Sequence, residues 1–119
     1  MKIVFIVDDS ETSLVAAEQA LEGNYKTYAM TEASEMFKLV EKITPNLILL
    51  DIDMPEMTGL EAMERLSQNP KTANIPIILL TAHSDKETVA KGLFLKASDY
   101  VVKPFAPHIL LKRIQKHIL

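Results

Sequence analysis

Short apolar runs alternate with helix-like segments along the chain, and this alternation constrains the fold more strongly than any other feature. The predicted strands cover residues 2–7, 25–30, 46–50, 75–80 and 99–102. Three of these runs are apolar almost throughout, which is typical of strands covered on both faces. Strands that alternate with helices predict a parallel sheet with helices on both sides. The sequence therefore indicates an α/β fold built from five β–α units.

Caps and helix-breaking residues mark the helices that follow these strands. Ser10 and Ser13 are candidate caps of a first helix that ends near Gly23, and an apolar arc over 34–43 predicts a second helix. Thr58 is a candidate cap of a third helix, which stops before Pro70. A capping box over 84–87 opens a fourth helix, and Pro107 lies in the first turn of a fifth. In the last helix, the predicted buried stripe consists of Leu110, Leu111, Ile114 and Ile118. Each strand is thus followed by a helix.

Length and composition indicate one globular domain over residues 1–119, with 48% hydrophobic and 24% charged residues. The net charge of −3 argues against a basic surface for nucleic acid. The absence of cysteine excludes disulfides, cysteine zinc sites and thiol catalysis. The apolar run near the N-terminus is too short for a signal peptide or a membrane span. We therefore expect a cytoplasmic protein without a membrane partner.

Polar residues stand at the carboxyl ends of four predicted strands. They are Asp8 and Asp9 after the first strand, Asp51 after the third, Thr81 after the fourth and Lys103 after the fifth. Each alone is best interpreted as a solvated turn residue. The carboxyl ends of parallel strands meet at one edge of the sheet, where such folds bind ligands. Together, these residues therefore predict a single site.

Three clustered carboxylates, a hydroxyl and an amine indicate phosphoryl chemistry with a divalent cation. Two carboxylates 4 Å apart repel one another by roughly 1–4 kcal/mol, and a bound cation removes this cost. Ligands that are all oxygen favour Mg²⁺ or Mn²⁺, and Mg²⁺ commonly binds together with phosphate. The amine and hydroxyl can donate to phosphoryl oxygens, and a carboxylate can act as the nucleophile. The histidines His83, His108 and His117 form no metal pattern, and we expect the last two to be solvated on the final helix.

Four segments carry a close resemblance to the receiver domain of two-component response regulators. They are "VDDS" (7–10), "ILLDIDMPEMTGLE" (48–61), "PIILLTAH" (76–83) and "ASDYVVKPF" (97–105), in receiver order and spacing. The resemblance implies a doubly wound, flavodoxin-like (βα)5 three-layer sandwich with a parallel five-stranded sheet of order 2-1-3-4-5. It also implies a phosphoacceptor switch that catalyses only its own phosphorylation and dephosphorylation.

Two other readings compete with this one. A phosphatase of the haloacid-dehalogenase type also combines Asp-x-Asp, a hydroxyl, a lysine and an acidic pair. In that family, however, the acidic pair comes last, whereas here Asp8 and Asp9 come first, and the chain leaves no room for a substrate-selecting cap. A degenerate receiver that only binds partners is disfavoured because the whole residue set is present.

The resemblance assigns roles to the clustered residues. Asp51 is the expected phosphoacceptor, and its donor is a phosphohistidine on a sensor histidine kinase or a phosphotransfer protein. Asp9 and Asp51 are expected to bind Mg²⁺ directly, Asp8 through water, and Asp53 through its backbone carbonyl. Lys103 is expected to pair with Asp51 and then with the phosphoryl group. Thr81 and Ala82 complete the phosphoryl-binding set.

The resemblance also implies a switch and an output face. Tyr100 is the aromatic expected to move inward with Thr81, while Asp53 and His83 flank the entrance and tune the dephosphorylation rate. The expected output face consists of Lys86, Val89, Leu93, Tyr100 and Arg113. Its partner is an output protein or domain, or a second copy in a phosphorylation-dependent homodimer. Whether the receiver stands alone or belongs to a longer protein stays open at this point, as does its kinase.

The helix over 84–97 has more apolar surface than one buried stripe needs. With about 100° per residue, its apolar side chains span roughly 240°, although a helix on a sheet needs a stripe of little more than ~100°. We therefore expect apolar surface near Val89 and Leu93 to remain exposed. The alternative is a thick local core under Phe94.

Two positions depart from the receiver pattern, and two further features match it. Lys96 stands where glycine commonly ends the fourth helix, so we expect a positive φ with some strain. Ala106 stands at the usual Ser or Thr cap and weakens the start of the last helix. The Lys103–Pro104 bond is expected to be cis, and Gly59 is expected to serve a tight entry to the third helix.

Overall fold

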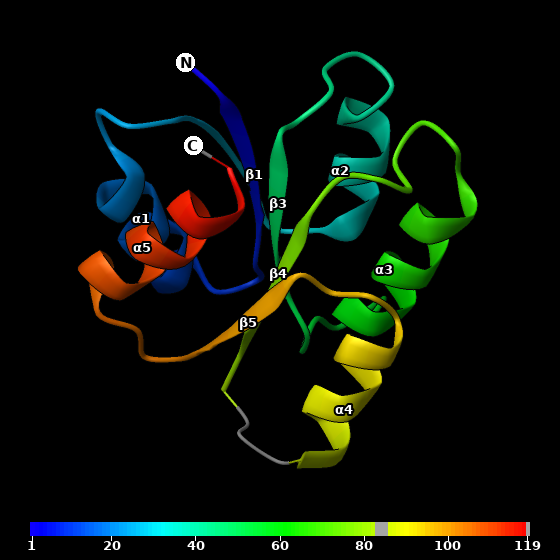
Figure 1. The fold of residues 1–119 in the computed structure, drawn as a ribbon. Coiled ribbons are helices and arrows are strands. Elements are labelled where there is room, and N and C mark those ends of the chain that lie inside the picture. The colour runs from blue at the N-terminus through cyan, green and yellow to red at the C-terminus, as the bar shows by residue number, and fades with distance from the viewer. Residues whose placement is uncertain (83–85, 119) are drawn as a thin grey trace.

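A five-stranded parallel sheet lies between two layers of helices in the computed structural model, which describes residues 1–82 and 86–118 (Figure 1). The strands are β1 (Ile3–Val7), β2 (Lys26–Met30), β3 (Leu47–Asp51), β4 (Ile77–Thr81) and β5 (Asp99–Val102). Their spatial order is β2-β1-β3-β4-β5, and every neighbouring pair is parallel. The predicted fold class, strand order and strand positions are confirmed.

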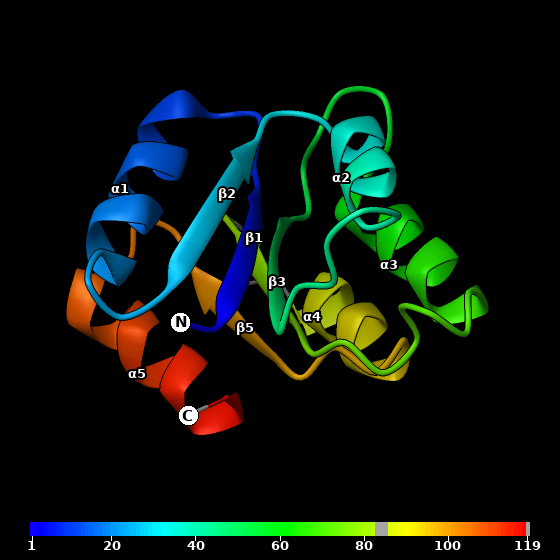
Figure 2. The same cartoon turned by 90° about the horizontal axis from the view of Figure 1, so that it is seen from above.

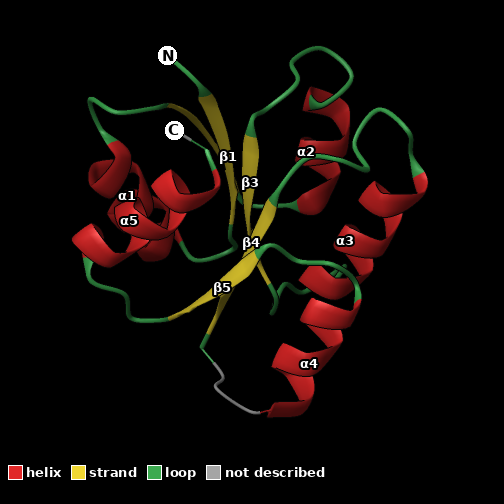
Figure 3. Cartoon of the chain, viewed as in Figure 1, coloured by secondary structure: helices red, strands yellow, loops and turns green. Residues whose placement is uncertain are grey.

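The helices cover both faces of the sheet. They are α1 (Glu11–Leu21), α2 (Ala33–Leu39), α3 (Gly59–Gln68), α4 (Lys86–Phe94) and α5 (Pro107–His117). Helices α1 and α5 lie on one face, and α2, α3 and α4 lie on the other (Figures 1 and 2). Figure 3 shows how strand and helix alternate along the chain. Among the described residues, no helix has the length and apolar character needed to cross a membrane.

The central strands divide their side chains between two cores. In β1, Phe5 points into the core under α2 and α3, while Ile6 points into the core under α1 and α5. Every residue of β3 and β4 is buried, which confirms that both faces of these strands are covered. Each buried Leu or Ile stabilises the fold by about 1.5–3 kcal/mol relative to an exposed one. The cores therefore hold the carboxyl ends of β1, β3 and β4 in fixed positions.

The helix caps agree with the sequence in most places. The Ser10 side chain caps α1 by accepting from the Ser13 backbone N–H, so Ser13 lies inside the helix rather than capping it. Thr58 and Glu61 form a reciprocal capping box at the start of α3. Ala106 caps α5 without a side-chain hydrogen bond, as expected. The predicted capping box over 84–87 includes residues outside the described part of the chain.

Two helix predictions need correction or detail. Helix α2 ends at Leu39, four residues before the predicted end at Ile43. The chain closes the helix in a turn over residues 40–42, in which the N–H groups of Lys42 and Ile43 both donate to the Leu39 carbonyl. In α5, Leu110 and Ile114 are fully buried, whereas the other two members of the predicted stripe, Leu111 and Ile118, pack only partly buried against the core.

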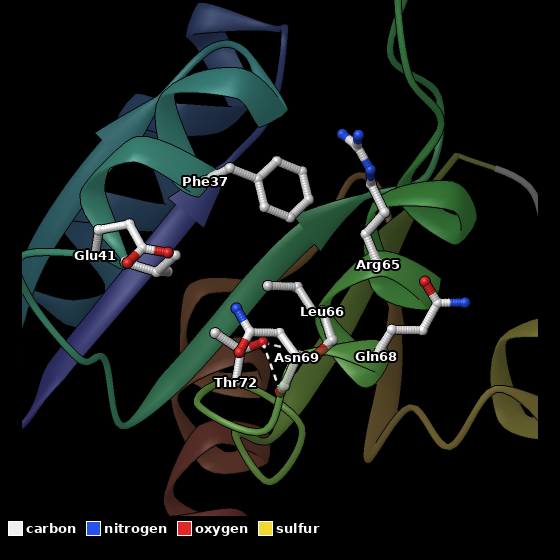
Figure 4. Close-up of a pocket in the computed structure, with 8 residues that line it drawn as sticks. Phe37, Glu41, Arg65, Leu66, Gln68, Asn69 and Thr72 are labelled. Carbon is white, nitrogen blue, oxygen red and sulfur yellow. Dashed lines mark hydrogen bonds between the residues drawn. The ribbon is translucent and has the colours of Figure 1, made fainter.

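A small hollow of about 290 Å³ separates α2 from α3 (Figure 4). The Arg65 guanidinium lies 5.4 Å from the centre of the Phe37 ring, and the two side chains bridge the helices. At the base of the hollow, the buried Thr72 hydroxyl donates to the Leu66 carbonyl at 2.6 Å. These contacts tie the end of α3 to the turn that leads into β4.

Lys96 ends α4 with a φ of 71°, which confirms the expected left-handed backbone. Its N–H donates to the Leu93 carbonyl, and the Ala97 N–H donates to the Gly92 carbonyl, in the pattern of a glycine-type helix end. A side chain in this conformation costs roughly 1 kcal/mol, which glycine avoids.

We therefore expect Lys96→Gly to stabilise the protein by about 0.5–1 kcal/mol. Urea unfolding monitored by circular dichroism measures this change. Lys96→Ala serves as the control, because it removes the charge and keeps the strain. Equal stability of the glycine and alanine variants would show that this backbone position carries no strain.

Candidate functional site

Asp8, Asp9 and Asp51 meet at the carboxyl edge of the sheet. One carboxylate oxygen from each lies within 4.8 Å of the other two. Asp51 ends β3, and Asp8 directly follows the neighbouring β1, so the strand pairing places their side chains together. Asp8 and Asp51 are buried, whereas Asp9 is exposed. The predicted carboxylate cluster is therefore present and opens to solvent on the side of Asp9.

Lys103 reaches this cluster from the end of β5. Its Nζ lies 2.6 Å from Asp8 Oδ2 and 3.3 Å from Asp51 Oδ1. The expected pair with Asp51 is present, but the shorter contact is with Asp8. Asp8 Oδ1 in turn accepts from the Ser10 N–H at 2.9 Å, which fixes its carboxylate. The Lys103–Pro104 bond is cis, as expected.

The electrostatics of the cluster are dominated by burial. Burial raises the pKa of Asp51 from its ordinary 3.8 to about 7; the charge of Asp8 acts in the same direction, and Lys103 acts against both. Burial alone would lower the pKa of Lys103, but its contacts with Asp8 and Asp51 outweigh this and raise it. In this arrangement, Asp51 is only partly ionised near neutral pH.

The residues present fit a divalent cation. The ligands are carboxylate oxygens, which hard cations such as Mg²⁺ prefer. Three carboxylates also carry more negative charge than Lys103 neutralises, and a bound divalent cation would balance the excess. Asp53 follows two residues after Asp51 with an exposed side chain.

The remaining predicted site residues occupy different positions around this cluster. Thr81 is fully buried at the end of β4, and Ala82 follows it with an exposed side chain. Tyr100 lies on β5 with 36% of its surface exposed. His83, predicted to flank the entrance, lies outside the described residues.

The predicted output residues lie on α4, β5 and α5. Leu93 is 51% exposed and Val89 is partly buried, so apolar surface does remain exposed on α4. Arg113 is exposed on α5. Lys86 is the first residue of α4, but its side chain, like that of Phe94, lies outside the described part of the structure.

Asp99 is a residue whose contacts the sequence did not reveal. It binds Arg113 Nη1 at 2.7 Å and lies 3.2 Å from Nε2 of His117. Burial alone would raise the pKa of Asp99, but hydrogen bonds from the Tyr100 backbone and from Arg113 outweigh it and lower the pKa. The expectation of a solvated His117 is therefore wrong, whereas His108 is exposed as expected. The four-residue spacing of Arg113 and His117, which places both on one face of α5, was the sequence signal that could have indicated a shared partner.

Gly59 brings the start of α3 directly against the carboxyl end of β3. Its N–H donates to the Ile52 carbonyl at 2.8 Å. A Cβ at this position would lie 2.8 Å from the Ile52 Cα and would overlap the carbonyl oxygen of Asp51. The requirement for glycine is therefore the close approach of two backbones, which explains the tight entry to α3.

Gly59→Ala is expected to destabilise the protein by about 1–3 kcal/mol, because overlap with backbone atoms forces α3 away from β3. Urea unfolding measures the loss. Gln68→Ala, an exposed change in the same helix, is the control and is expected to be nearly neutral. Unchanged stability of the Gly59 variant would contradict the close approach.

Fold and site together define a class of protein. Residues 4–115 match the family of the response regulator receiver domain, and the chain belongs to this family. It is therefore a receiver domain, the phosphoacceptor switch of two-component signalling, and receivers generally bind Mg²⁺.

Individual relatives are similar to this chain in structure or in sequence. The chemotaxis protein CheY4 of Vibrio cholerae superposes with a TM-score of 0.93 at 28% identity, over 99% of both chains. The phosphate regulon regulator PhoB of Pseudomonas aeruginosa is 35% identical over 96% of this chain and 50% of its own length. A probable cyclic di-GMP phosphodiesterase of V. cholerae is 36% identical over 97% of this chain and 26% of its own. The chain thus spans about a quarter to a half of these two curated relatives.

Proposed function

We propose that Asp51 accepts a phosphoryl group from a phosphohistidine of a sensor histidine kinase or a phosphotransfer protein. The observation that carries this proposal is the convergence of Asp8, Asp9, Asp51 and Lys103 at one edge of the sheet. The cation would be Mg²⁺, held directly by Asp9, Asp51 and the backbone carbonyl of Asp53 and through water by Asp8, and Mn²⁺ suits the same oxygen ligands. Residues 1–119 act as one receiver domain, and the transfer takes place in the cytoplasm.

The chemistry is a transfer between two nucleophiles. A carboxylate oxygen of Asp51 attacks phosphorus, the phosphorus–nitrogen bond of the donor breaks, and the imidazole leaves with that bonding pair. A bound Mg²⁺ supplies charge neutralisation of the phosphoryl oxygens. Lys103, positioned by Asp8, lies close enough to donate to the new phosphoryl group. Because only ionised Asp51 is nucleophilic, the positive charge of Lys103 also favours the reactive form.

The product is held and read by residues at the ends of β4 and β5. Thr81 and Ala82 bind phosphoryl oxygens together with Lys103, and Tyr100 moves inward as Thr81 moves. Asp53 and His83 set how fast water removes the group. The transfer shifts a two-state equilibrium that a partner reads at the output face.

Phosphorylation by acetyl phosphate in the presence of Mg²⁺ tests the acceptor assignment. The protein is expected to incorporate one phosphoryl group, and Asp51→Asn is expected to abolish incorporation. Asp53→Asn keeps the backbone carbonyl and is expected to retain labelling, which makes it the matched control. Turnover of phosphate esters, measured with p-nitrophenyl phosphate, would instead favour a phosphatase of the haloacid-dehalogenase type.

Leu93→Glu tests the output face. Because Leu93 is 51% exposed, this change is expected to leave the fold and Asp51 phosphorylation intact. It is expected to abolish association with a partner or a second copy that depends on phosphorylation. Sedimentation with and without beryllofluoride measures self-association, and Val15→Glu, an exposed change on α1, is the control. Unchanged association of the Leu93 variant would place the output surface elsewhere.

A further inference from the structure

An apolar groove of about 550 Å³ runs between α3 and α4, apart from the site and from Leu93. Figures 1 and 2 show these two helices side by side on one face of the sheet. The floor is formed by Leu60 of α3, Ala90 of α4 and the following Leu95. Leu60 and Leu95 are partly buried against the core, and Ala90 is exposed.

Gly92 lets α4 pack close to the sheet beside this groove. It lies buried between α4 and the sheet, where an added Cβ would overlap the Leu79 side chain and lie 3.8 Å from Cδ2 of Leu60. With no side chain at this position, α4 packs directly on β4 and nothing from position 92 fills the space beside Leu60. The small Ala90 adds little bulk on the same side.

The rim of the groove is acidic. Glu61 and Glu64 border it from α3, and Glu87 and Lys91 border it from α4. Lys91 lies 3.7 Å from Glu87 within the same helix, and both side chains are largely exposed. Among the lining residues, three carboxylates therefore face one ammonium group. An apolar floor with a surplus of negative charge fits an apolar surface that carries positive charge.

We propose that this groove binds a basic amphipathic helix of a partner protein. The partner's apolar side chains, spaced at i, i+3, i+4 and i+7, would contact Leu60, Ala90 and Leu95, and its Lys or Arg side chains would face Glu64 and Glu87. A helix suits the groove better than an extended segment, because both walls are helices and offer no strand edge with which to pair. A helix satisfies its own backbone hydrogen bonds and needs only side-chain contacts.

This surface is distinct from the proposed output face. On α4, Leu93 points to solvent at 51% exposure, whereas Ala90 and Lys91 line the groove toward α3. Binding is expected in the unphosphorylated protein, so a failure of this proposal and a failure of the phosphoacceptor assignment give different results.

A fluorescein-labelled, acetylated 14-residue peptide serves as the probe, with leucines at i, i+3, i+4 and i+7 and lysines elsewhere. Fluorescence anisotropy measures its affinity, and amide chemical shifts map its contacts. The peptide is expected to bind with a Kd of about 1–100 µM, typical of small transient interfaces, and to shift the amides of Leu60, Glu64 and Ala90. A peptide of the same composition with its leucines spread around the helix is expected to bind at least about tenfold more weakly.

Two variants separate the charge from the apolar floor. Glu64→Lys is expected to weaken binding about tenfold, and Ala90→Gln is expected to weaken it severalfold by placing a polar chain in the groove. Glu22→Lys makes the same charge change after α1, on the opposite face of the sheet, and is expected to leave affinity unchanged. The proposal is overturned by equal weakening in the Glu22 variant, by equal binding of both peptides, by shifts confined to another surface, or by no binding. Self-association sensitive to Glu64→Lys without peptide binding would also overturn it, in favour of a second copy.

Discussion

Asp51→Asn is expected to unfold at a higher urea concentration than the wild-type protein at pH 8 in the absence of divalent cations. The wild-type protein must hold an ionised carboxylate in a buried position beside Asp8, and asparagine removes that charge with almost no change in size. The rise of the Asp51 pKa from 3.8 to about 7 sets the gain at up to about 4 kcal/mol.

The sign of the pH dependence follows from the raised pKa of Asp51. A carboxyl with a higher pKa in the folded state binds its proton more tightly there, so it destabilises the fold once it ionises. Wild-type stability is therefore expected to fall as the pH rises from about 4 to about 7 and to level off above that range. The Asn variant is expected to lack this part of the fall.

Urea unfolding between pH 4.5 and pH 8 with a chelator measures both effects. Asp53→Asn removes an exposed carboxylate and is the matched control, with a pH profile expected to follow the wild type. Adding Mg²⁺ at pH 8 is expected to stabilise the wild-type protein more than Asp51→Asn, because Mg²⁺ binds the ionised carboxylates. Parallel pH profiles of wild type and Asp51→Asn would show that Asp51 titrates normally.

Lys103→Met is expected to destabilise the protein by about 3 kcal/mol at pH 8. Lys103 is only 15% exposed and contacts two buried carboxylates, and removal of one partner from a buried ion pair typically costs about 3–5 kcal/mol. The loss is expected to be smaller at pH 5, because Asp51 becomes protonated there. Loss of Lys103 also raises the pKa of Asp51 further, since the lysine lowers it in the wild-type protein.

Lys71→Met is the matched control for this variant. Lys71 lies 3.5 Å from Glu41, but both side chains are more than half exposed. Such surface pairs contribute about 0–1 kcal/mol, so the control is expected to remain near wild-type stability. Urea unfolding at pH 5 and pH 8 measures all three proteins. Equal losses for the two lysine variants would contradict a special role for the Lys103 contacts.

The sheet could be predicted from the sequence because its signals are local. The fully buried β3 and β4 appear as uninterrupted apolar runs, and β1 ends where the acidic pair begins. The end of α2 was predicted four residues too late, because the apolar period continues to Ile43 while the helix stops at Leu39. Val40 and Ile43 still pack against the core from the turn that follows α2. The apolar pattern therefore indicated which residues are buried but not where the helix ends.

The members of the candidate site could be predicted because parallel strands bring their carboxyl ends to one edge. The pair of Lys103 with Asp51 was expected and is present, but the shorter contact of Lys103 with Asp8 could not be predicted, because it depends on side-chain geometry. Lys103 lies closer to Asp8 than to Asp51, a difference that sequence position does not encode. The same holds for the approach of Gly59 to the backbone of Asp51, which requires the path of both segments.

The central claim is that Asp51 accepts a phosphoryl group in a site that needs a divalent cation. Mass spectrometry of the wild-type protein after treatment with acetyl phosphate and Mg²⁺ tests it most directly. The acyl phosphate is trapped by borohydride reduction before digestion, so that the modified residue can be located. We expect one modification, at Asp51, that disappears when a chelator replaces Mg²⁺. A modification at Asp8, Asp9 or Asp53, or labelling of Asp51 that persists in the chelator, would contradict the account.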